Sequence, residues 1–234
     1  MQSETVIVTG STSGIGLELS RLLVSGGQKV LGIGRRPCPE DFLKNPLYEH
    51  LTLDFCSRDW PIRLDEFFEA KFCNNDISGF VHCSGSVVLK NIVDSSDSDL
   101  TSQVSINLTS VLLLLKRVLP LMCDRGGKVV LLGSRGRRFP FANGAAYCAS
   151  KAGLHAINDC LALEMKNEKK LLGTTIIEFG TVQTGFGGVE SDGQQISARG
   201  AASRILKLLD TEELEDFDQR VIEIVPSVKR RLDG

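Results

Sequence analysis

The sequence predicts a three-layer α/β fold, in which helices cover both faces of a doubly wound parallel sheet. Short apolar runs alternate with longer segments of helical pattern along the 234 residues. The runs are apolar on both faces, as in strands that are buried between two layers of helices. A chain of this length with 42% hydrophobic and 24% charged residues is typical of one globular domain, so we expect 1–234 to form a single domain.

The elements are expected in a regular order along the chain. The first strand lies in TVIVT at 5–9, and a helix follows at about 15–24. Further runs rich in Val, Ile and Leu predict strands at 29–34, 50–54, 77–83, 128–133, 174–179 and 220–225. Longer segments with apolar residues at helical spacing predict helices at about 97–122, 145–169 and 198–209. The loop 185–197 is rich in glycine and polar residues, so it is the best candidate for a mobile lid.

Charge and cysteine content exclude several classes of function. The net charge is −2, so a nucleic-acid partner is not expected. The seven cysteines show neither a CxxC pair nor metal-ligand spacing, which favours a reduced, cytoplasmic compartment and no metal site. The N-terminus lacks the pattern of a secretory signal. The apolar stretch 111–122 contains Lys116 and Arg117, so it predicts a buried helix rather than a membrane span.

A glycine-rich turn follows the first predicted strand. In TGSTSGIG at 9–16, Gly10 permits a tight turn, and Gly14 and Gly16 let the backbone approach a ligand closely. The N-terminus of the next helix would then attract a pyrophosphate through its free N–H groups and dipole. The alternative is an ordinary turn between strand and helix, but the position at the start of the chain favours a dinucleotide site.

The end of the second strand indicates which dinucleotide binds. A carboxylate there would bind a ribose hydroxyl, whereas basic residues would bind a 2′-phosphate. Gly34 stands where the acid is expected, and Arg35 and Arg36 follow it. We therefore expect NADP(H) to be preferred, with NAD(H) as the second choice, unless the arginines are only a solvated surface pair. Asp54 either contacts the adenine end or is a turn residue at the end of a strand.

Tyr147 and Lys151 are four residues apart, so they share one face of a predicted helix. A nearby ammonium favours the phenolate, which would let Tyr147 exchange a proton with a carbonyl or alcohol oxygen. Ser134 ends the fifth predicted strand, at the sheet edge where such folds bind ligands, and its hydroxyl can bond a substrate oxygen. Asn107 lies within an apolar helical stretch, and it either holds a water for a relay with Lys151 or is a satisfied core amide.

The motifs together resemble a known family. TGSTSGIG, NLTS at 107–110, Ser134, YCASK at 147–151 and GTVQT at 180–184 have the order and spacing of the classical short-chain dehydrogenases/reductases. The chain resembles this family over nearly its whole length. The resemblance implies a Rossmann-type fold and a nicotinamide-dependent oxidoreductase that interconverts a small-molecule carbonyl compound and its alcohol.

The resemblance also implies roles for individual residues. It implies a catalytic tetrad of Asn107, Ser134, Tyr147 and Lys151, of which Lys151 would also hold the nicotinamide ribose. We expect a dinucleotide-binding half at about 1–95 and a catalytic half with a short lid at about 96–234. The expected cofactor contacts are Gly10, Ser11, Ser13, Gly14, Ile15, Gly16, Arg35, Arg36, Asp54, Phe55, Ser84, Gly85, Tyr147, Lys151, Gly180, Val182 and Thr184.

The chain departs from the family pattern at three places. His82 and Cys83 replace the two asparagines of the usual NNAG motif, which removes the usual stabilising contacts. Ser13 stands where many NADP-preferring members have a basic residue. Phe179 replaces a proline before the turn that contacts the nicotinamide, so that turn is expected to be looser.

Three segments are expected to determine the substrate, namely 86–89, 135–143 and the lid 185–197. Arg135, Arg137 and Arg138 either form a cationic rim for an anionic substrate, or face water or pair with acidic neighbours such as Glu164. Phe139 and Phe141 either form an apolar pocket wall or simply pack.

Two other kinds of protein share parts of this motif pattern. A non-catalytic NADP(H)-binding sensor or scaffold would use the same fold, but retention of the tyrosine and the lysine disfavours it. An epimerase or dehydratase of the longer related type would need a further substrate domain. The resemblance implies a homodimer or homotetramer that associates through the helices at 97–122 and 145–169.

Overall fold

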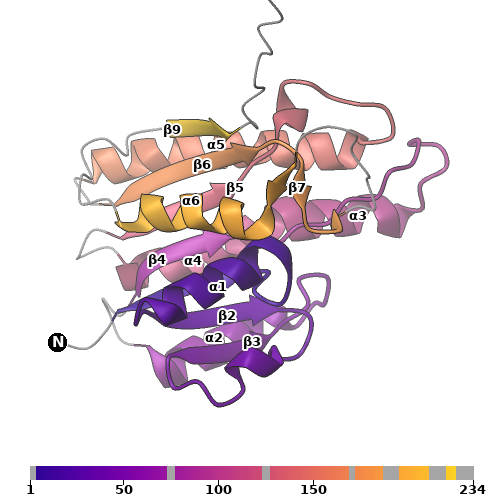
Figure 1. Cartoon of the computed structure of the whole chain (residues 1–234). Helices are drawn as coiled ribbons and strands as arrows, with labels where there is room; N and C mark the ends of the chain where they lie inside the picture. Colours follow the sequence, from indigo (N-terminus) through magenta and orange to yellow (C-terminus); the bar gives the residue numbers. More distant parts are fainter. Residues whose placement is uncertain are drawn as a thin grey trace, which may run out of the picture.

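The protein is built around a seven-stranded sheet in which every neighbouring pair of strands is parallel. A computed structural model describes residues 4–72, 77–122, 127–168, 172–186, 195–210 and 220–224. The strand order is β3-β2-β1-β4-β5-β6-β9, and the arrowheads in Figure 1 point toward one edge of the sheet. The strands are β1 Thr5–Thr9, β2 Lys29–Gly34, β3 Tyr48–Thr52, β4 Ile77–His82, β5 Lys128–Leu132, β6 Gly173–Phe179 and β9 Arg220–Ile224.

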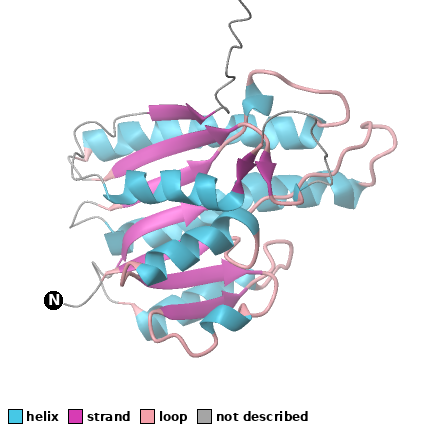
Figure 2. Cartoon of the chain, viewed as in Figure 1, coloured by secondary structure: helices cyan, strands magenta, loops and turns pink. Residues whose placement is uncertain are grey.

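Helices cover both faces of this sheet, as Figure 2 shows. They are α1 Gly14–Ser25, α2 Trp60–Lys71, α3 Asp97–Val104, α4 Ser110–Met122, α5 Ala145–Asn167 and α6 Ala198–Asp210. One hydrophobic cluster lies between the sheet and α2, α4 and α5, and a second lies between the sheet and α1 and α6. Ile7 of β1 belongs to the first cluster, and its neighbours Val6 and Val8 belong to the second, because successive side chains of a strand point to opposite faces. The predicted three-layer fold is therefore confirmed.

The strand order reverses direction between β1 and β4. The chain runs outward from β1 through β2 to β3, then returns to β4 on the other side of β1 and runs outward again. The connections that follow β1 and β4 therefore diverge, which leaves a crevice at the carboxyl edge of the sheet. Doubly wound sheets bind their ligands at this point, and the predicted glycine turn lies there.

The predicted helix at 97–122 contains a change of helical type. α3 begins with a capping box in which the Ser96 and Asp99 side chains exchange hydrogen bonds with each other's backbone. A π-helical turn at Ser105–Thr109 then joins α3 to α4, and such turns are frequent at functional sites. By length and composition alone, Asp97–Met122 is apolar enough to cross a membrane, with a mean hydropathy of 1.5. Core helices share that composition, and α4 buries Val111, Leu114, Leu115, Val118 and Met122.

Three local features differ from the sequence-based expectation. α2 was not predicted, although Trp60, Leu64 and Phe68 form a buried stripe on it. β3 begins and ends two residues earlier than expected, because Tyr48 already packs in the core. Two short strands, β7 Val182–Gln183 and β8 Ile196–Ser197, form a separate parallel pair beside the start of α6. β7 precedes the predicted lid at 185–197, and β8 forms its last two residues. Residues 187–194 of the lid lie outside the described part of the chain.

Candidate active site

The glycine turn between β1 and α1 is shaped as a close-fitting backbone cradle. Gly10 has φ 67° and Gly14 has φ 54°, a conformation that glycine adopts without strain. A Cβ on Gly10 would lie 2.9 Å from the backbone nitrogen of Ser84, at the start of the segment after β4. A Cβ on Gly16 would lie 2.5 Å from the carbonyl oxygen of Gly10. The turn therefore accepts only glycine at these positions, as the sequence analysis expected.

The N-terminus of α1 fits an anion. Ser13 occupies the N-cap position in an extended conformation, but its side chain caps no backbone N–H. The first turn of α1 also contains no acidic residue. Free N–H groups and the positive end of the helix dipole therefore face the cradle, which is the arrangement that binds a pyrophosphate.

Some predicted contact residues have their side chains inside the protein. Ser11 is fully buried, and its hydroxyl accepts a hydrogen bond from the Tyr48 hydroxyl at 3.0 Å. Ile15 packs against the second core cluster. Phe55 is buried edge-on against Trp60, with ring centroids 5.0 Å apart. The structure thus keeps the Ser11 and Phe55 side chains in the core.

Arg35 and Arg36 emerge at the carboxyl end of β2, beside the glycine turn. Both side chains are exposed, and within the described residues neither forms an ion pair with a carboxylate. The backbone carbonyl of Arg36 is bonded to Nε2 of His50 at 2.9 Å, which fixes the start of this loop. At Gly34, a Cβ would lie 2.8 Å from the Thr12 methyl carbon, so an acid in this place would require the Thr12 side chain to shift.

Asp54 organises a turn rather than ending a strand. It follows β3 by two residues, and its Oδ1 accepts a hydrogen bond from the backbone N–H of Cys56 at 3.0 Å. Its carbonyl oxygen accepts bonds from the backbone and the hydroxyl of Ser57. The turn interpretation of Asp54 is therefore supported, and Oδ2 is not used by this turn.

The predicted nicotinamide turn lies against the glycine turn. A Cβ on Gly14 would approach the Thr184 side chain to within 3.2 Å. Gly180 donates its N–H to the Ile224 carbonyl at 2.8 Å, which ties the end of β6 to β9. Val182 is the first residue of β7, and Thr184 directly follows this strand. The residues expected at the pyrophosphate and at the nicotinamide are thus adjacent in space.

His82 and Cys83 join the ends of β1 and β4 despite replacing two asparagines. Nδ1 of His82 is 3.0 Å from the Thr9 hydroxyl, and that hydroxyl accepts a bond from the Ser84 N–H at 3.1 Å. Complete burial lowers the pKa of His82 to about 3, so the imidazole is neutral. Burial also raises the pKa of Cys83 to about 12, which keeps it a thiol. The substitutions therefore preserve a link between the strands at the Ser84–Gly85 segment.

Tyr147 and Lys151 lie on one face of α5, with the Lys151 ammonium nitrogen 5.9 Å from the centroid of the tyrosine ring. Burial raises the pKa of Tyr147, and a hydrogen bond with Ser134 partly opposes this effect. Burial lowers the pKa of Lys151 to about 8. Lys151 Nζ donates to the Leu132 carbonyl at the end of β5, at 2.7 Å. Three of the four predicted tetrad residues are therefore together at the carboxyl edge.

Asn107, the fourth predicted residue, lies in the π-helical turn and is fully buried. Its Nδ2 donates to the Ser86 carbonyl at 2.8 Å and to the Ser150 hydroxyl at 3.1 Å. Its Oδ1 accepts from the Ser86 N–H at 2.7 Å. Both amide protons are thus used, which supports the interpretation as a satisfied core amide that holds the Ser86 backbone and α5.

The basic loop after β5 pairs with an acid that the sequence analysis missed. Arg137 Nε is 3.1 Å from Glu178 Oε1, and Arg138 Nη2 is 2.9 Å from Glu178 Oε2. The acidic-partner interpretation is thus supported for both arginines, with Glu178 in place of the expected Glu164. Arg135 lies over the Phe139 ring at 5.3 Å. Glu178 stands alone within an apolar strand, and that isolation was the only indication of its role in the sequence.

Two aromatic rings flank Tyr147. The ring centroid of Phe141 is 6.2 Å from that of Tyr147, and the centroid of Phe186 is 6.3 Å away on another segment. Phe141 was expected either to line a pocket or to pack, and its ring lies against Gly144, which supports packing. Phe186 belongs to the segment after β7 and was not singled out from the sequence.

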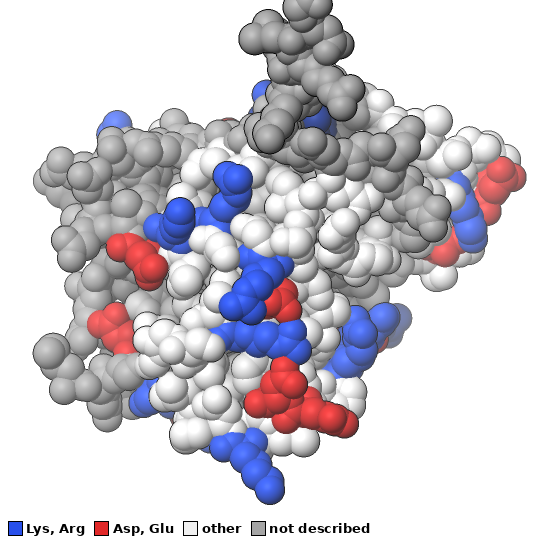
Figure 3. Space-filling view, viewed as in Figure 1, with Lys and Arg blue, Asp and Glu red and all other residues white. Residues whose placement is uncertain are grey.

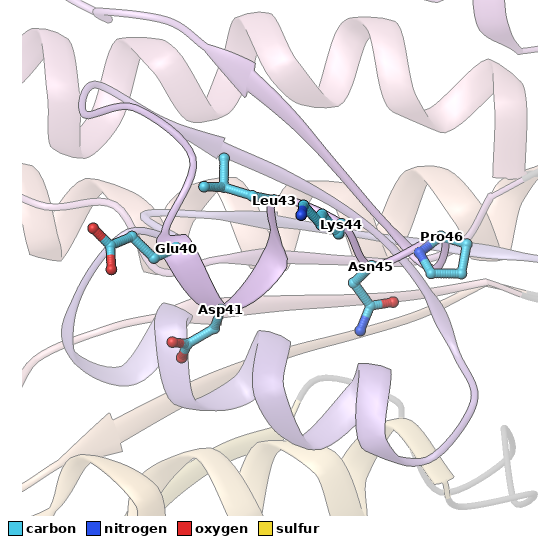
Figure 4. A pocket seen from close by; sticks show the side chains of 6 residues that line it. All are labelled: Glu40, Asp41, Leu43, Lys44, Asn45 and Pro46. Atoms are coloured by element: carbon cyan, nitrogen blue, oxygen red, sulfur yellow. The ribbon is translucent and has the colours of Figure 1, made fainter.

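Other surface features lie apart from this site. Figure 4 shows an open pocket at 40–46, whose side chains point in different directions. Figure 3 shows basic and acidic side chains next to one another on the face formed by α1 and α6. There, Arg21 pairs with Glu18 and Asp41, and Arg199 lies 3.7 Å from Glu18. Neither feature combines a cradle with groups suited to proton transfer.

Comparison with known proteins identifies the family. A family profile described as "short chain dehydrogenase" matches residues 4–195. The chain belongs to the short-chain dehydrogenase family. This is a family of oxidoreductases, which confirms the resemblance inferred from the motifs.

Individual relatives and structures agree with this assignment. The chain is 34% identical over 170 residues to the short chain dehydrogenase ausX of Penicillium brasilianum, covering 72% of this chain and 65% of the relative. It is 33% identical to the short chain dehydrogenase prhI of the same organism, covering 72% and 66%. The chain thus matches slightly less than two thirds of the length of these relatives. A serine dehydrogenase solved in its closed form with NADP+ has the same fold, with TM-score 0.82, 22% identity and coverage of 98% of both chains.

Proposed function

We propose that this short-chain dehydrogenase interconverts a ketone and an alcohol with NADP(H) as the cofactor. The observation that carries the proposal is the position of Tyr147, bonded to Ser134 and one helical turn from Lys151, at the edge of the sheet that also bears the glycine cradle. The same edge presents two exposed arginines without a carboxylate partner in the described residues. A dinucleotide with a 2′-phosphate would account for all of these features together.

Three groups of residues at this edge of the sheet fit NADP(H). The amides at the α1 N-terminus and Gly14 would hold the pyrophosphate, and Arg35 and Arg36 would hold the 2′-phosphate. Lys151 would donate to the ribose hydroxyls next to the nicotinamide. When bound, the cofactor supplies the hydride for reduction or accepts it in oxidation.

Tyr147 acts as the acid in reduction. Because burial raises its pKa, the phenol is protonated at neutral pH, which is the form that donates a proton to a carbonyl oxygen. Ser134 donates a second hydrogen bond to that oxygen, which stabilises the negative charge that develops there. The Lys151 ammonium then stabilises the tyrosinate, and in the oxidation direction the same tyrosinate accepts the proton of the alcohol.

The test is NADPH oxidation by the chain over a panel of neutral and carboxylated ketones, with Tyr147→Phe beside the wild type. The proposal predicts turnover by the wild type and a loss of about 10³-fold or more in the variant, whereas NADPH binding measured by calorimetry stays within twofold. NADPH binding without turnover of any ketone would instead support a non-catalytic sensor. Absence of NADPH binding would contradict the cofactor assignment.

We also propose that the chain forms a homodimer or homotetramer through α4 and α5. Leu112 of α4 is 51% exposed and Leu163 of α5 is 54% exposed, so both helices present leucine side chains to solvent. Replacement of both residues by lysine should shift the sedimentation coefficient to that of a monomer. An unchanged sedimentation coefficient would contradict this interface.

A further inference from the structure

Glu178 is a buried carboxylate at the end of β6, directly before the nicotinamide turn. Its exposed fraction is 0%. Gly133 of the neighbouring segment leaves room for it, because a Cβ at that position would lie 3.2 Å from Glu178 Cγ. A buried charge requires partners that satisfy it. Glu178 therefore occupies a defined position in the protein interior, next to Gly133.

Two guanidinium groups are hydrogen-bonded to the carboxylate, and a histidine ring lies close to it. Oε1 lies 3.1 Å from Arg137 Nε and 2.8 Å from His155 Nε2, and Oε2 lies 2.9 Å from Arg138 Nη2. The side chains of Arg137 and Arg138 are 29% and 39% exposed, so they lie between the carboxylate and the solvent. Their guanidinium groups point at Glu178, and this contact holds the loop that begins at Ser134.

The surroundings of Tyr147 are apolar in contrast. Phe141 and Phe186 flank its ring and are 45% and 44% exposed, although large aromatic side chains are usually buried. Phe141 is further held against Gly136 and Gly144. Exposed aromatic rings next to a reacting group are typical of a site for an apolar ligand.

We propose that the substrate is a neutral carbonyl compound with an apolar body that lies between Phe141 and Phe186, and that Glu178 determines this selectivity by withdrawing Arg137 and Arg138 from the cleft. This inference rests on the proposed function, since it concerns the substrate of the same site. Without the carboxylate, two guanidinium groups beside Ser134 would attract an anionic substrate.

The test compares a bicyclic ketone with the same ketone carrying a carboxylate. Binding of each compound is measured by calorimetry in the presence of NADP+, and kcat/KM is measured where turnover occurs. The wild type should bind the neutral compound at least tenfold more tightly. Glu178→Gln should raise the ratio of carboxylated to neutral binding by about tenfold or more, because it removes the negative charge that offsets the two guanidinium groups. Glu164→Gln, an exposed change of equal charge on α5, should leave the ratio unchanged.

Two further variants keep the proposal testable if Glu178→Gln fails to fold. Arg138→Gln should change the ratio of carboxylated to neutral binding by less than about twofold, because the Arg138 guanidinium pairs with Glu178 and not with the substrate. Phe186→Ser should weaken binding of the neutral ketone by about fivefold or more, because it removes one apolar wall. A wild type that prefers the carboxylated ketone, or an Arg138→Gln variant that loses affinity for it tenfold, would overturn the proposal. Because binding is measured separately, absence of turnover would refute the proposed function and leave this result intact.

Discussion

Replacement of Lys151 by methionine is expected to stabilise the free protein at neutral pH while it removes the activity. The Lys151 side chain is 4% exposed, and burial lowers its pKa from 10.5 to about 8. Burial therefore disfavours the ammonium that catalysis requires. Methionine has a similar length, fills the same space and carries no charge.

The size of the effect follows from the two pKa values. Their difference corresponds to about 3 kcal/mol of unfavourable free energy for the charged side chain at pH 7. The variant also loses the hydrogen bond from Nζ to the Leu132 carbonyl, which contributes about 1 kcal/mol. We therefore expect Lys151→Met to raise the free energy of unfolding by about 2 kcal/mol at pH 7.

The same pKa values determine how this difference changes with pH. Above about pH 8 the folded wild type releases the Lys151 proton, whereas the unfolded chain keeps it up to about pH 10.5. The unfolded state then binds more protons, so the contribution of Lys151 to stability rises between these values. The stability of the variant lacks this rise. The difference in free energy of unfolding between the variant and the wild type should therefore disappear by about pH 10.

Urea denaturation without cofactor at about pH 7, 8.5 and 10 measures this difference. Lys116→Met is the matched control, since Lys116 is exposed on α4 and its replacement should change the free energy of unfolding only slightly. A Lys151→Met variant less stable than the wild type at neutral pH would refute the reasoning. A stability difference that stays constant with pH would refute it as well.

Three other changes test the cofactor site and its support. Arg35→Asp should lower the ratio of kcat/KM for NADPH to that for NADH by about 10–100-fold, and an unchanged ratio would contradict the phosphate assignment. Gly14→Ala and Gly27→Ala should each lower the free energy of unfolding by about 1–2 kcal/mol, because both glycines have positive φ. Only Gly14→Ala should weaken NADPH binding by calorimetry, because Gly27 has nothing within 4 Å of a Cβ. Asn107→Ala should lower the free energy of unfolding, measured in urea, by about 2–3 kcal/mol, because the Ser86 backbone loses two hydrogen bonds to the Asn107 side chain. An unchanged stability would contradict this role of Asn107.

The sequence predicted the fold well where apolar runs have sharp ends. β1 at 5–9 and β2 at 29–34 coincide with their predicted ranges. The helix α2 was missed because charged residues occupy most of its surface, although Trp60, Leu64 and Phe68 recur at helical spacing. The π-helical turn around Asn107 has no sequence pattern, because it depends on how the helix packs against its neighbours.

The candidate site was predictable where a residue type is required by local backbone geometry. The glycines of the cradle and the spacing of Tyr147 and Lys151 belong to this class. The role of Glu178 was not predictable, because its partners come from a loop about forty residues earlier and from α5. The burial of Ser11 also depends on a distant side chain, the Tyr48 hydroxyl. Such contacts are fixed only when the strands are placed in their final order.

Transfer of deuterium to a ketone from NADPH that carries deuterium at both C4 hydrogens of the nicotinamide tests the central claim most directly. After incubation of the chain with the labelled cofactor and a neutral bicyclic ketone, mass spectrometry of the alcohol gives the deuterium content. The proposed function predicts one deuterium at the carbinol carbon with the wild type, and none above background with Tyr147→Phe at saturating cofactor. An unlabelled alcohol from the wild type, or equal labelling by the Tyr147→Phe variant, would contradict it.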